Sequence, residues 1–319
     1  DELSLLEPKV IRDIHITYRD AGADVITTNT FGANRLSLAR FGLEDQVQAI
    51  NVAAAKLARE AISDDRPMYV AGSVGPLPLE MDRNADSTEV LLEQVDALAG
   101  AGVDFIFFET QPSRAALETC ARAMVERPEL PFMLSCTVYS DTESASGETI
   151  PHLLAPLPPE LPKPIAWGIN CGAGPDALLT AAERALSLID LPLILLPNAG
   201  IPKEIDQRRI YLCSPDYLAG FAKRYLDLGV RGIGGCCGTT PEHIREIAQR
   251  IKPLARGAAE KFKIEVAESV TPQEATPFAE KSRLAWRLAN KRWVTTVELL
   301  PPRGCDLGPT IAKARDLYV

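Results

Sequence analysis

The sequence lacks the features that would place it in a membrane or on a nucleic acid. No apolar run approaches the roughly 18 residues of a membrane-spanning helix, and the 319-residue chain opens with Asp1-Glu2 instead of a basic and then apolar signal segment. Its 34 Lys and Arg are outnumbered by 43 Asp and Glu, for a net charge of -9. That balance argues against a phosphate backbone or an anionic membrane as the main partner. We therefore expect a soluble, cytoplasmic protein that binds neither nucleic acid nor membranes.

The seven cysteines do not fit a disulfide framework. Their number is odd, and two of them, Cys236 and Cys237, are adjacent, which is a poor arrangement for structural disulfides. Reduced thiols, some of them metal ligands, fit the sequence better. With 46% hydrophobic residues, the chain is long enough for one large core or two ordinary ones.

Short apolar runs alternate with helical patterns through most of the chain. Seven runs predict strands, at residues 23–31, 67–75, 103–110, 131–138, 164–172, 191–200 and 230–238. Helical patterns fill the intervals, among them residues 7–22, 87–102, 112–128, 175–189 and 215–229. Apolar strands that alternate with helices indicate an α/β protein with a parallel sheet. The number of units predicts a (β/α)8 TIM barrel that lacks one strand.

The two ends of the chain do not follow this pattern. Because residues 7–22 are helical and lead into the first visible strand, we expect the first barrel strand to lie upstream, so that residues 1–251 form a barrel without it. Residues 252–290 are charged, contain prolines and lack strong strand runs, which predicts a linker. Residues 291–319 read as a strand, a Pro-Gly loop and the start of a helix, and predict the start of a second barrel that the chain does not complete.

The carboxyl ends of the strands, where the chemistry of such barrels is found, lack lysine, histidine and arginine. That absence argues against Schiff-base aldolase chemistry and against imidazole general bases, because both need a titratable nitrogen. The residues that do close the strands are Thr28, Asn29, Ser73, Glu109, Ser135, Cys136, Asn170, Cys171, Asn198, Cys236 and Cys237.

Three of these residues are thiols that can meet at one point if their strand ends are close in space: Cys171, Cys236 and Cys237. Three thiolates with metal–sulfur distances of about 2.3 Å suit Zn²⁺, and a catalytic zinc keeps its fourth position open. One alternative is that Cys171 is a small buried apolar residue. Another is that the GGCCG loop, residues 234–238, packs tightly or binds phosphate next to the helix start at residues 240–242. Two adjacent cysteines serve no purpose in a phosphate site.

Glu109 ends the apolar run FIFFE, where a carboxylate is costly unless it has a partner. It either contacts a substrate or forms a structural salt bridge. Asn198 is expected to cap the next segment or to bond a loop backbone. The three histidines, His15, His152 and His243, lie in helical or loop patterns and are expected to be structural.

The motifs GINCGAGP (168–175), LPNAG (196–200) and GGCCGTTPEHI (234–244) resemble the homocysteine S-methyltransferase family. TNTFGAN (28–34) and FFET (107–110) also match, in the same order, so the resemblance covers roughly residues 1 to 251. The fold of that family is a zinc-bearing (β/α)8 barrel, which is the expectation for this chain.

Carried over by position, the resemblance implies a zinc site made of three thiolates and, without substrate, an asparagine oxygen: Cys171, Cys236, Cys237 and Asn198. It also implies that Glu109 contacts the amino group of homocysteine. Thr28 and Asn170, which lie in matched motifs, are expected to contact substrate as well. The family's glycine-rich first strand is missing here, so poor substrate binding is expected.

The tail carries a second resemblance. VTTVELLPPRG (294–304) is similar to the opening strand of the methylenetetrahydrofolate reductase family, a flavin-dependent barrel. The resemblance implies that Glu298 is an acid near the folate and that FAD belongs to the incomplete second domain. It also implies a bifunctional parent chain that is truncated here at both ends.

These observations predict a zinc-dependent transferase that passes a methyl group to the thiolate of homocysteine and yields methionine. The candidate donors are a methylfolate, methylcobalamin, a sulfonium or a betaine-type quaternary amine, and a fused reductase favours the folate by association only. Two alternatives stay open. One is a phosphate-binding barrel enzyme that uses the GGCCG loop, and the other is a non-catalytic, zinc-stabilised fragment.

Overall fold

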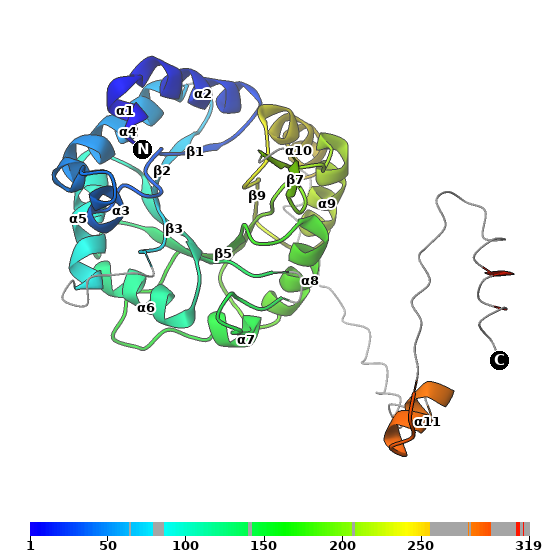
Figure 1. Ribbon diagram of the computed structural model, residues 1–319. Helices are drawn as coiled ribbons and strands as arrows, with labels where there is room; N and C mark the ends of the chain where they lie inside the picture. The colour runs from blue at the N-terminus through cyan, green and yellow to red at the C-terminus, as the bar shows by residue number, and fades with distance from the viewer. Residues whose placement is uncertain are drawn as a thin grey trace. The chain divides into compact units, whose positions relative to one another are not determined.

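The computed structural model describes residues 1–63, 65–78, 86–139, 142–205, 208–255, 280, 282–294, 311, 312 and 315. The chain divides into two compact units, Asp1–Glu260 and Lys261–Val319. The first unit contains the ring of strands and helices in Figure 1. The second contains helix α11 (Arg283–Ala289). No helix in the described parts of the chain is both long and apolar enough to cross a membrane.

Seven parallel strands form one sheet in the order β1-β2-β3-β4-β5-β6-β9 (Figure 1). Their bounds are β1 Val25–Thr27, β2 Tyr69–Val74, β3 Phe105–Gln111, β4 Phe132–Cys136, β5 Ala166–Asn170, β6 Leu193–Leu196 and β9 Gly232–Ile233. Each overlaps one of the seven predicted strands, so the predicted parallel barrel-like fold is confirmed. Among the described residues the outermost strands, β1 and β9, do not pair with each other.

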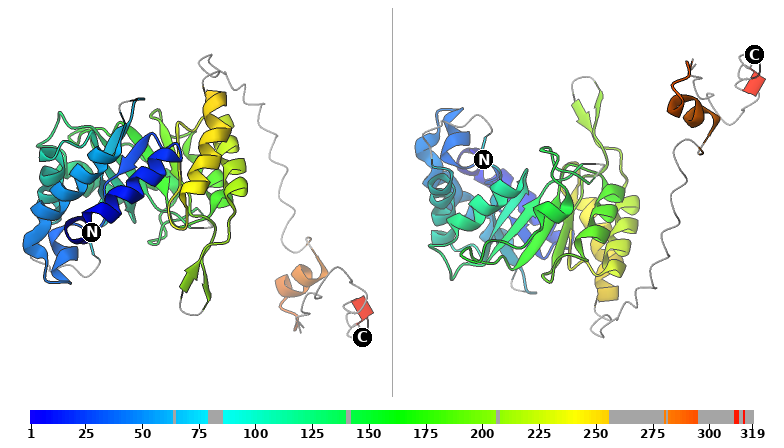
Figure 2. Two further views of the ribbon diagram at one scale, coloured as in Figure 1. Left: turned by 90° about the horizontal axis from the view of Figure 1, so that it is seen from above. Right: turned by 90° about the horizontal axis from the view of Figure 1, so that it is seen from below.

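Helices cover the outer face of this sheet (Figures 1 and 2). Their bounds are α1 Leu3–Leu6, α2 Pro8–Asp20, α3 Arg35–Ala39, η1 Glu44–Gln46, α4 Val47–Ala61, α5 Ser87–Gly100, α6 Arg114–Ala123, α7 Ile150–Leu153, α8 Pro175–Ala185, α9 Pro215–Leu228 and α10 Pro241–Ala255. Proline opens α2, α8 and α9, and the side chains of Ser113 and Ser214 cap α6 and α9. An antiparallel hairpin, β7 (Lys203–Ile205) with β8 (Arg208–Ile210), projects from one end of the ring in Figure 2.

Helices α2 and α10 lie side by side and close the ring of helices (Figure 1). The Tyr18 hydroxyl donates a hydrogen bond to the Thr239 carbonyl oxygen, at 2.9 Å. Lys252 Nζ lies 2.6 Å from Asp24 Oδ1. These contacts hold the chain beyond β9 next to β1, although the two strands share no ladder.

The apolar core has two layers because successive residues of a strand point to opposite faces. Ile106 and Phe108 of β3 pack outward, in the large cluster between the sheet and the helices. Phe107 of the same strand packs inward, in a smaller cluster with Ala71, Met133 and Ala166. The inner cluster fills the barrel beneath the carboxyl ends of the strands.

The region predicted to be a linker, residues 252–290, contains helical structure at both ends. Helix α10 runs to Ala255, and α11 occupies Arg283–Ala289. The side chain of Ser282 caps α11 by accepting a hydrogen bond from the Ala285 N–H, at 3.0 Å. Residues 256–279 and most of the predicted second domain, Glu298 included, lie outside the described residues.

Candidate metal centre

The inner face of the sheet changes from apolar to polar at the carboxyl ends of its strands. The inner apolar cluster contains Ala71, Phe107, Met133 and Ala166. Two or four residues further along the same strands, and therefore on the same face, follow polar side chains: Ser73, Glu109, Ser135 and Asn170. The strand period thus brings four polar groups to the mouth of the barrel.

The three predicted thiols come together at this mouth. The Sγ atom of Cys237 lies 3.7 Å from that of Cys171 and 4.0 Å from that of Cys236. All three sulfurs lie within 4.8 Å of one another. In a tetrahedral zinc site with Zn–S distances of about 2.3 Å, the sulfurs are about 3.8 Å apart. The cluster therefore fits a zinc ion with little movement.

The backbone after β5 adopts a strained turn that presents Cys171. Cys171 has φ +60° and Gly172 has φ +67°. A Cβ atom at Gly172 would lie 2.2 Å from the carbonyl oxygen of Val138, so only glycine fits there. The positive φ of Cys171 is uncommon for a residue with a side chain and is found most often at functional sites.

The loop after β6 holds the loop after β9. The N–H of Cys236 donates to the Pro197 carbonyl oxygen at 2.8 Å, and the Ala199 N–H donates to the Cys237 carbonyl oxygen at 2.9 Å. The side chain of Asn198, only 5% exposed, accepts a hydrogen bond from the Cys237 N–H through Oδ1, at 3.1 Å. Asn198 therefore lies beside the thiol cluster and fixes the backbone of one of its cysteines.

The glycines of the GGCCG loop are packed against other groups of the protein. A Cβ at Gly235 would lie 2.3 Å from the side chain of Thr239. One at Gly238, where φ is +78°, would lie 2.2 Å from the ring of Tyr211. This close packing fits the alternative in which the loop is simply tightly packed.

Hydrogen bonding among the thiols concentrates negative charge on one sulfur. The pKa of Cys237 is lowered to about 2, because the thiols of Cys171 and Cys236 donate hydrogen bonds to its sulfur and the hydroxyl of Tyr211 adds another. The pKa of Cys236 is raised, because its proton is held in the hydrogen bonds with Cys171 and Cys237. The lowered pKa of Cys237 favours its thiolate form, which is the form that binds a metal ion.

Glu109 lies at the mouth of the barrel with its carboxylate partly buried. Burial raises the pKa of this carboxyl group, the hydrogen bond that Ser73 Oγ donates to Oε1 opposes that rise, and the negative charge of Cys237 adds to it. No ion pair among the described residues includes Glu109. The structure therefore does not support the salt-bridge alternative, and the carboxylate is available to an external cationic group.

The other two predicted substrate contacts, Thr28 and Asn170, are buried and bonded within the protein. The hydroxyl of Thr28 lies 2.6 Å from that of Thr30 and accepts a hydrogen bond from the Ser73 N–H, at 3.0 Å. Asn170 is fully buried, and its amide bonds the backbone and side chain of Thr110. Both side chains thus form hydrogen bonds between neighbouring strand ends at the mouth of the barrel.

The three histidines lie outside the thiol cluster. His243 accepts a hydrogen bond from the Thr240 N–H at Nδ1, at 3.1 Å, and lies 2.9 Å from the Cys213 carbonyl oxygen through Nε2. His152 is exposed and pairs with Glu148. His15 is buried on α2.

Sequence reasoning missed Tyr211, which lies over Gly238 and bonds Cys237. This residue directly follows the β7–β8 hairpin, whose polar sequence lacks the apolar alternation that identifies a strand. A signal was available in Gly238 itself, because a glycine next to a candidate ligand indicates a close approach of other atoms.

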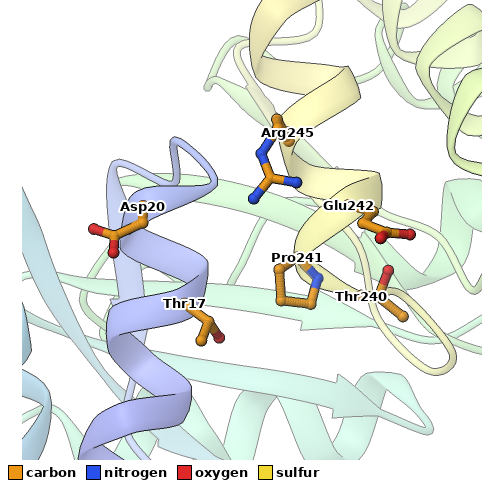
Figure 3. Close-up of a pocket in the computed structure, with 6 residues that line it drawn as sticks. All are labelled: Thr17, Asp20, Thr240, Pro241, Glu242 and Arg245. Carbon is orange, nitrogen blue, oxygen red and sulfur yellow. The ribbon is translucent and has the colours of Figure 1, made fainter.

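A separate cavity of about 570 Å³ lies between α2 and the start of α10 (Figure 3). It is lined by Thr17, Asp20, Thr240, Pro241, Glu242 and Arg245, and by none of the three cysteines. The lining includes the guanidinium group of Arg245 and the carboxylates of Asp20 and Glu242 (Figure 3). The cavity therefore has no excess of positive charge to select a phosphate.

Comparisons with known proteins identify relatives of this chain. The model of the homocysteine S-methyltransferase family matches residues 1–251. Methionine synthase of Mycobacterium leprae is 30% identical over 296 residues, which cover 88% of this chain and 24% of the relative. For methionine synthase of Mycobacterium tuberculosis the identity is 31% over 268 residues, with coverages of 80% and 22%. The chain thus spans about a quarter of the length of these curated relatives.

A solved structure extends the likeness to three dimensions. The metallated form of the homocysteine methyltransferase MmuM from Escherichia coli superposes with a TM-score of 0.65 at 28% identity. The match covers 78% of this chain and 87% of that one.

Proposed function

Because the chain belongs to the homocysteine S-methyltransferase family, we propose that it transfers a methyl group to the sulfur of homocysteine and yields methionine. The observation that carries the proposal is the cluster of three thiols at the mouth of the barrel, with sulfur separations of 3.7 and 4.0 Å. These separations suit a zinc ion, and three protein ligands leave a fourth position for the substrate thiol.

We propose Cys171, Cys236 and Cys237 as the zinc ligands, with the oxygen of Asn198 as a further ligand when homocysteine is absent. When bound, zinc would supply a positive centre that lowers the pKa of the substrate thiol. The three cysteine sulfurs place a high density of negative charge beside that thiol, which keeps the substrate sulfur electron-rich and nucleophilic. The N–H of Cys237 holds the Asn198 oxygen in the described structure, at 3.1 Å.

We propose that Glu109 binds the amino group of homocysteine. Its carboxylate is partly buried, forms no ion pair with a described residue and lies close enough to Cys237 for the two charges to interact. The hydroxyl of Ser73 donates a hydrogen bond to Oε1 and so orients the carboxylate. An ammonium group on the substrate would supply the missing positive partner.

The chain's own residues leave the methyl donor open among a methylfolate, methylcobalamin, a sulfonium and a betaine-type amine. A methylenetetrahydrofolate reductase activity of a longer parent chain, with FAD and with Glu298 as an acid, would favour the folate. That part of the proposal rests on residues 294–304, of which only Val294 is described. A cytoplasmic location likewise stays a prediction.

The test is methionine formation from homocysteine by the zinc-loaded chain, offered each donor in turn and followed by mass spectrometry. We expect turnover with at least one donor, retained in Cys213→Ser and reduced to background in Cys236→Ser. Cys213 is the matched control because it is a partly buried free thiol that is not one of the clustered cysteines. Turnover that survives Cys236→Ser would exclude a zinc–thiolate mechanism. A zinc-loaded chain that is inactive with every donor would favour a non-catalytic fragment.

A further inference from the structure

Strand β3 contains a bulge at the end that carries Glu109. Phe108 pairs with Leu134 of β4, and the ladder resumes where Gln111 pairs with Cys136. Two residues of β3, Glu109 and Thr110, therefore oppose a single residue of β4. Bulges of this kind change the direction of side chains and are common beside active sites.

Thr110 has a backbone conformation that its side chain disfavours. Its φ is +61°, in the left-handed region that β-branched residues rarely adopt. Its N–H lies within the bulge, outside the regular ladder. A strained residue persists only when surrounding groups hold it, so the conformation of Thr110 needs a specific partner.

Asn170 supplies that partner from β5, which lies on the far side of β4. Its Oδ1 accepts hydrogen bonds from the Thr110 N–H, at 2.8 Å, and from Ser135 Oγ, at 2.6 Å. Its Nδ2 donates to Thr110 Oγ1, at 2.7 Å. The side chain is fully buried, so no solvent competes for these bonds.

The same amide also contacts the thiol cluster. Its Nδ2 lies 4.0 Å from Cys236 Sγ, within reach of a weak hydrogen bond to sulfur. Asn170 is also joined through the backbone to Cys171, which has its own positive φ. The Asn170 side chain thus contacts both Thr110, which is next to Glu109, and Cys236 of the thiol cluster.

We propose that Asn170 is a positioning residue that holds Thr110 in the bulge and so directs the Glu109 carboxylate toward the substrate's amino group. It thereby determines the preference for thiols that carry an α-amino group over thiols that do not. This inference rests on the proposed function, in which Glu109 binds that amino group. The amide of Asn170 is itself hydrogen-bonded to Thr110 and Ser135.

The test measures binding, without a methyl donor, by calorimetry on the zinc-loaded 319-residue chain. The two ligands are L-homocysteine and 4-mercaptobutanoate, which keeps the thiol and the carboxylate but lacks the amino group. In Asn170→Ala we expect the Kd of homocysteine to rise at least about tenfold. The Kd of 4-mercaptobutanoate should change less than about twofold, and the zinc content should be unchanged.

If Asn170→Ala disturbs folding, Thr110→Val still tests the inference. This isosteric change removes only the bond between Thr110 Oγ1 and the Asn170 amide. It should weaken homocysteine binding in the same selective way, by a smaller factor. Adding Thr110→Gly to Asn170→Ala should recover part of the lost affinity, because glycine adopts positive φ without strain.

Equal weakening of both ligands, or loss of zinc in Asn170→Ala, would show a merely structural role and overturn the inference. A wild-type preference for homocysteine that survives Asn170→Ala overturns the inference alone. A wild-type chain that binds zinc but does not bind homocysteine would remove the proposed function, and the inference with it.

Discussion

The Sγ atoms of Cys171 and Cys237 lie 3.7 Å apart, although 66 positions separate the two residues in the chain. The parallel sheet accounts for this proximity, because β5 and β9 both flank β6 and all three strands end at the same edge. The loop after β6 completes the arrangement through the bond between Ala199 N–H and the Cys237 carbonyl oxygen. The thiol cluster is thus built on three neighbouring strands and does not depend on pairing between β1 and β9.

Replacement of Glu109 by glutamine keeps the shape of the side chain and removes its charge. We expect the affinity for homocysteine to fall roughly 10- to 100-fold, because a hydrogen bond to a charged group contributes about 1.5–3 kcal/mol. The affinity for 4-mercaptobutanoate should not fall. Calorimetry with both ligands checks this, with Glu89→Gln on the exposed surface of α5 as the control. Unchanged homocysteine affinity in Glu109→Gln would show that the carboxylate does not contact the amino group.

Alanine variants of Gly42 and Gly238 distinguish the cost of backbone strain from the cost of steric overlap, because the two glycines have similar φ angles but different surroundings. Gly42 has φ +69° with no atom within 4 Å of an added Cβ, whereas Gly238 has φ +78° and would place its Cβ 2.2 Å from the ring of Tyr211. Gly42→Ala should cost about 1–2 kcal/mol of unfolding free energy from the backbone angle alone.

Gly238→Ala should cost more than Gly42→Ala and should also weaken zinc binding, because Tyr211 must move and the adjacent Cys237 moves with the loop. Urea unfolding and competition with a metal chelator measure the two effects. Equal destabilisation of both variants with unchanged zinc affinity would contradict the close packing of Tyr211 on Gly238.

His15 makes stability fall in mild acid. Its Nε2 atom is buried without a hydrogen-bond partner, and burial lowers its pKa from 6.5 to about 4. Between pH 6.5 and about pH 4, His15 is protonated in the unfolded chain but not in the folded chain. The unfolded state is therefore favoured as the pH falls. Over this pH range the free energy of unfolding falls by about 3 kcal/mol.

The effect of His15 is measured as unfolding free energy between pH 7 and pH 4. His15→Gln should have a shallower pH dependence than the wild type. If the stability of His15→Gln fell more steeply with falling pH than that of the wild type, His15 would not be the cause of the acid sensitivity.

The strands were predictable because their apolar, β-branched runs are bounded by glycine, proline and polar residues, but their ends were not. The run at residues 23–31 yields only Val25–Thr27, because the hydroxyls of Thr28 and Thr30 bond the backbone of Ser73 instead of continuing the ladder. The run at residues 230–238 yields only Gly232–Ile233. Its remaining glycines form the loop that presents the cysteines.

The thiols of the candidate site were predictable because residue type and strand-end position both indicated them. The bulge at Glu109 and Thr110 was not, because a positive φ at threonine opposes local preference and is set by Asn170, 60 positions away. Helix α11, within the predicted linker, was missed because its short sequence carries little periodicity beyond the Ser282 cap. Such features depend on tertiary contacts or on single caps, which a pattern along the chain does not reveal.

Zinc content per chain, measured by elemental analysis after dialysis, tests the central claim most directly. The account predicts one zinc in the wild type and in Cys213→Ser, and none in folded Cys171→Ser or Cys236→Ser. A folded wild-type chain that holds no zinc, or cysteine variants that retain it, would contradict the three-thiolate site and the methyl transfer proposed to occur there.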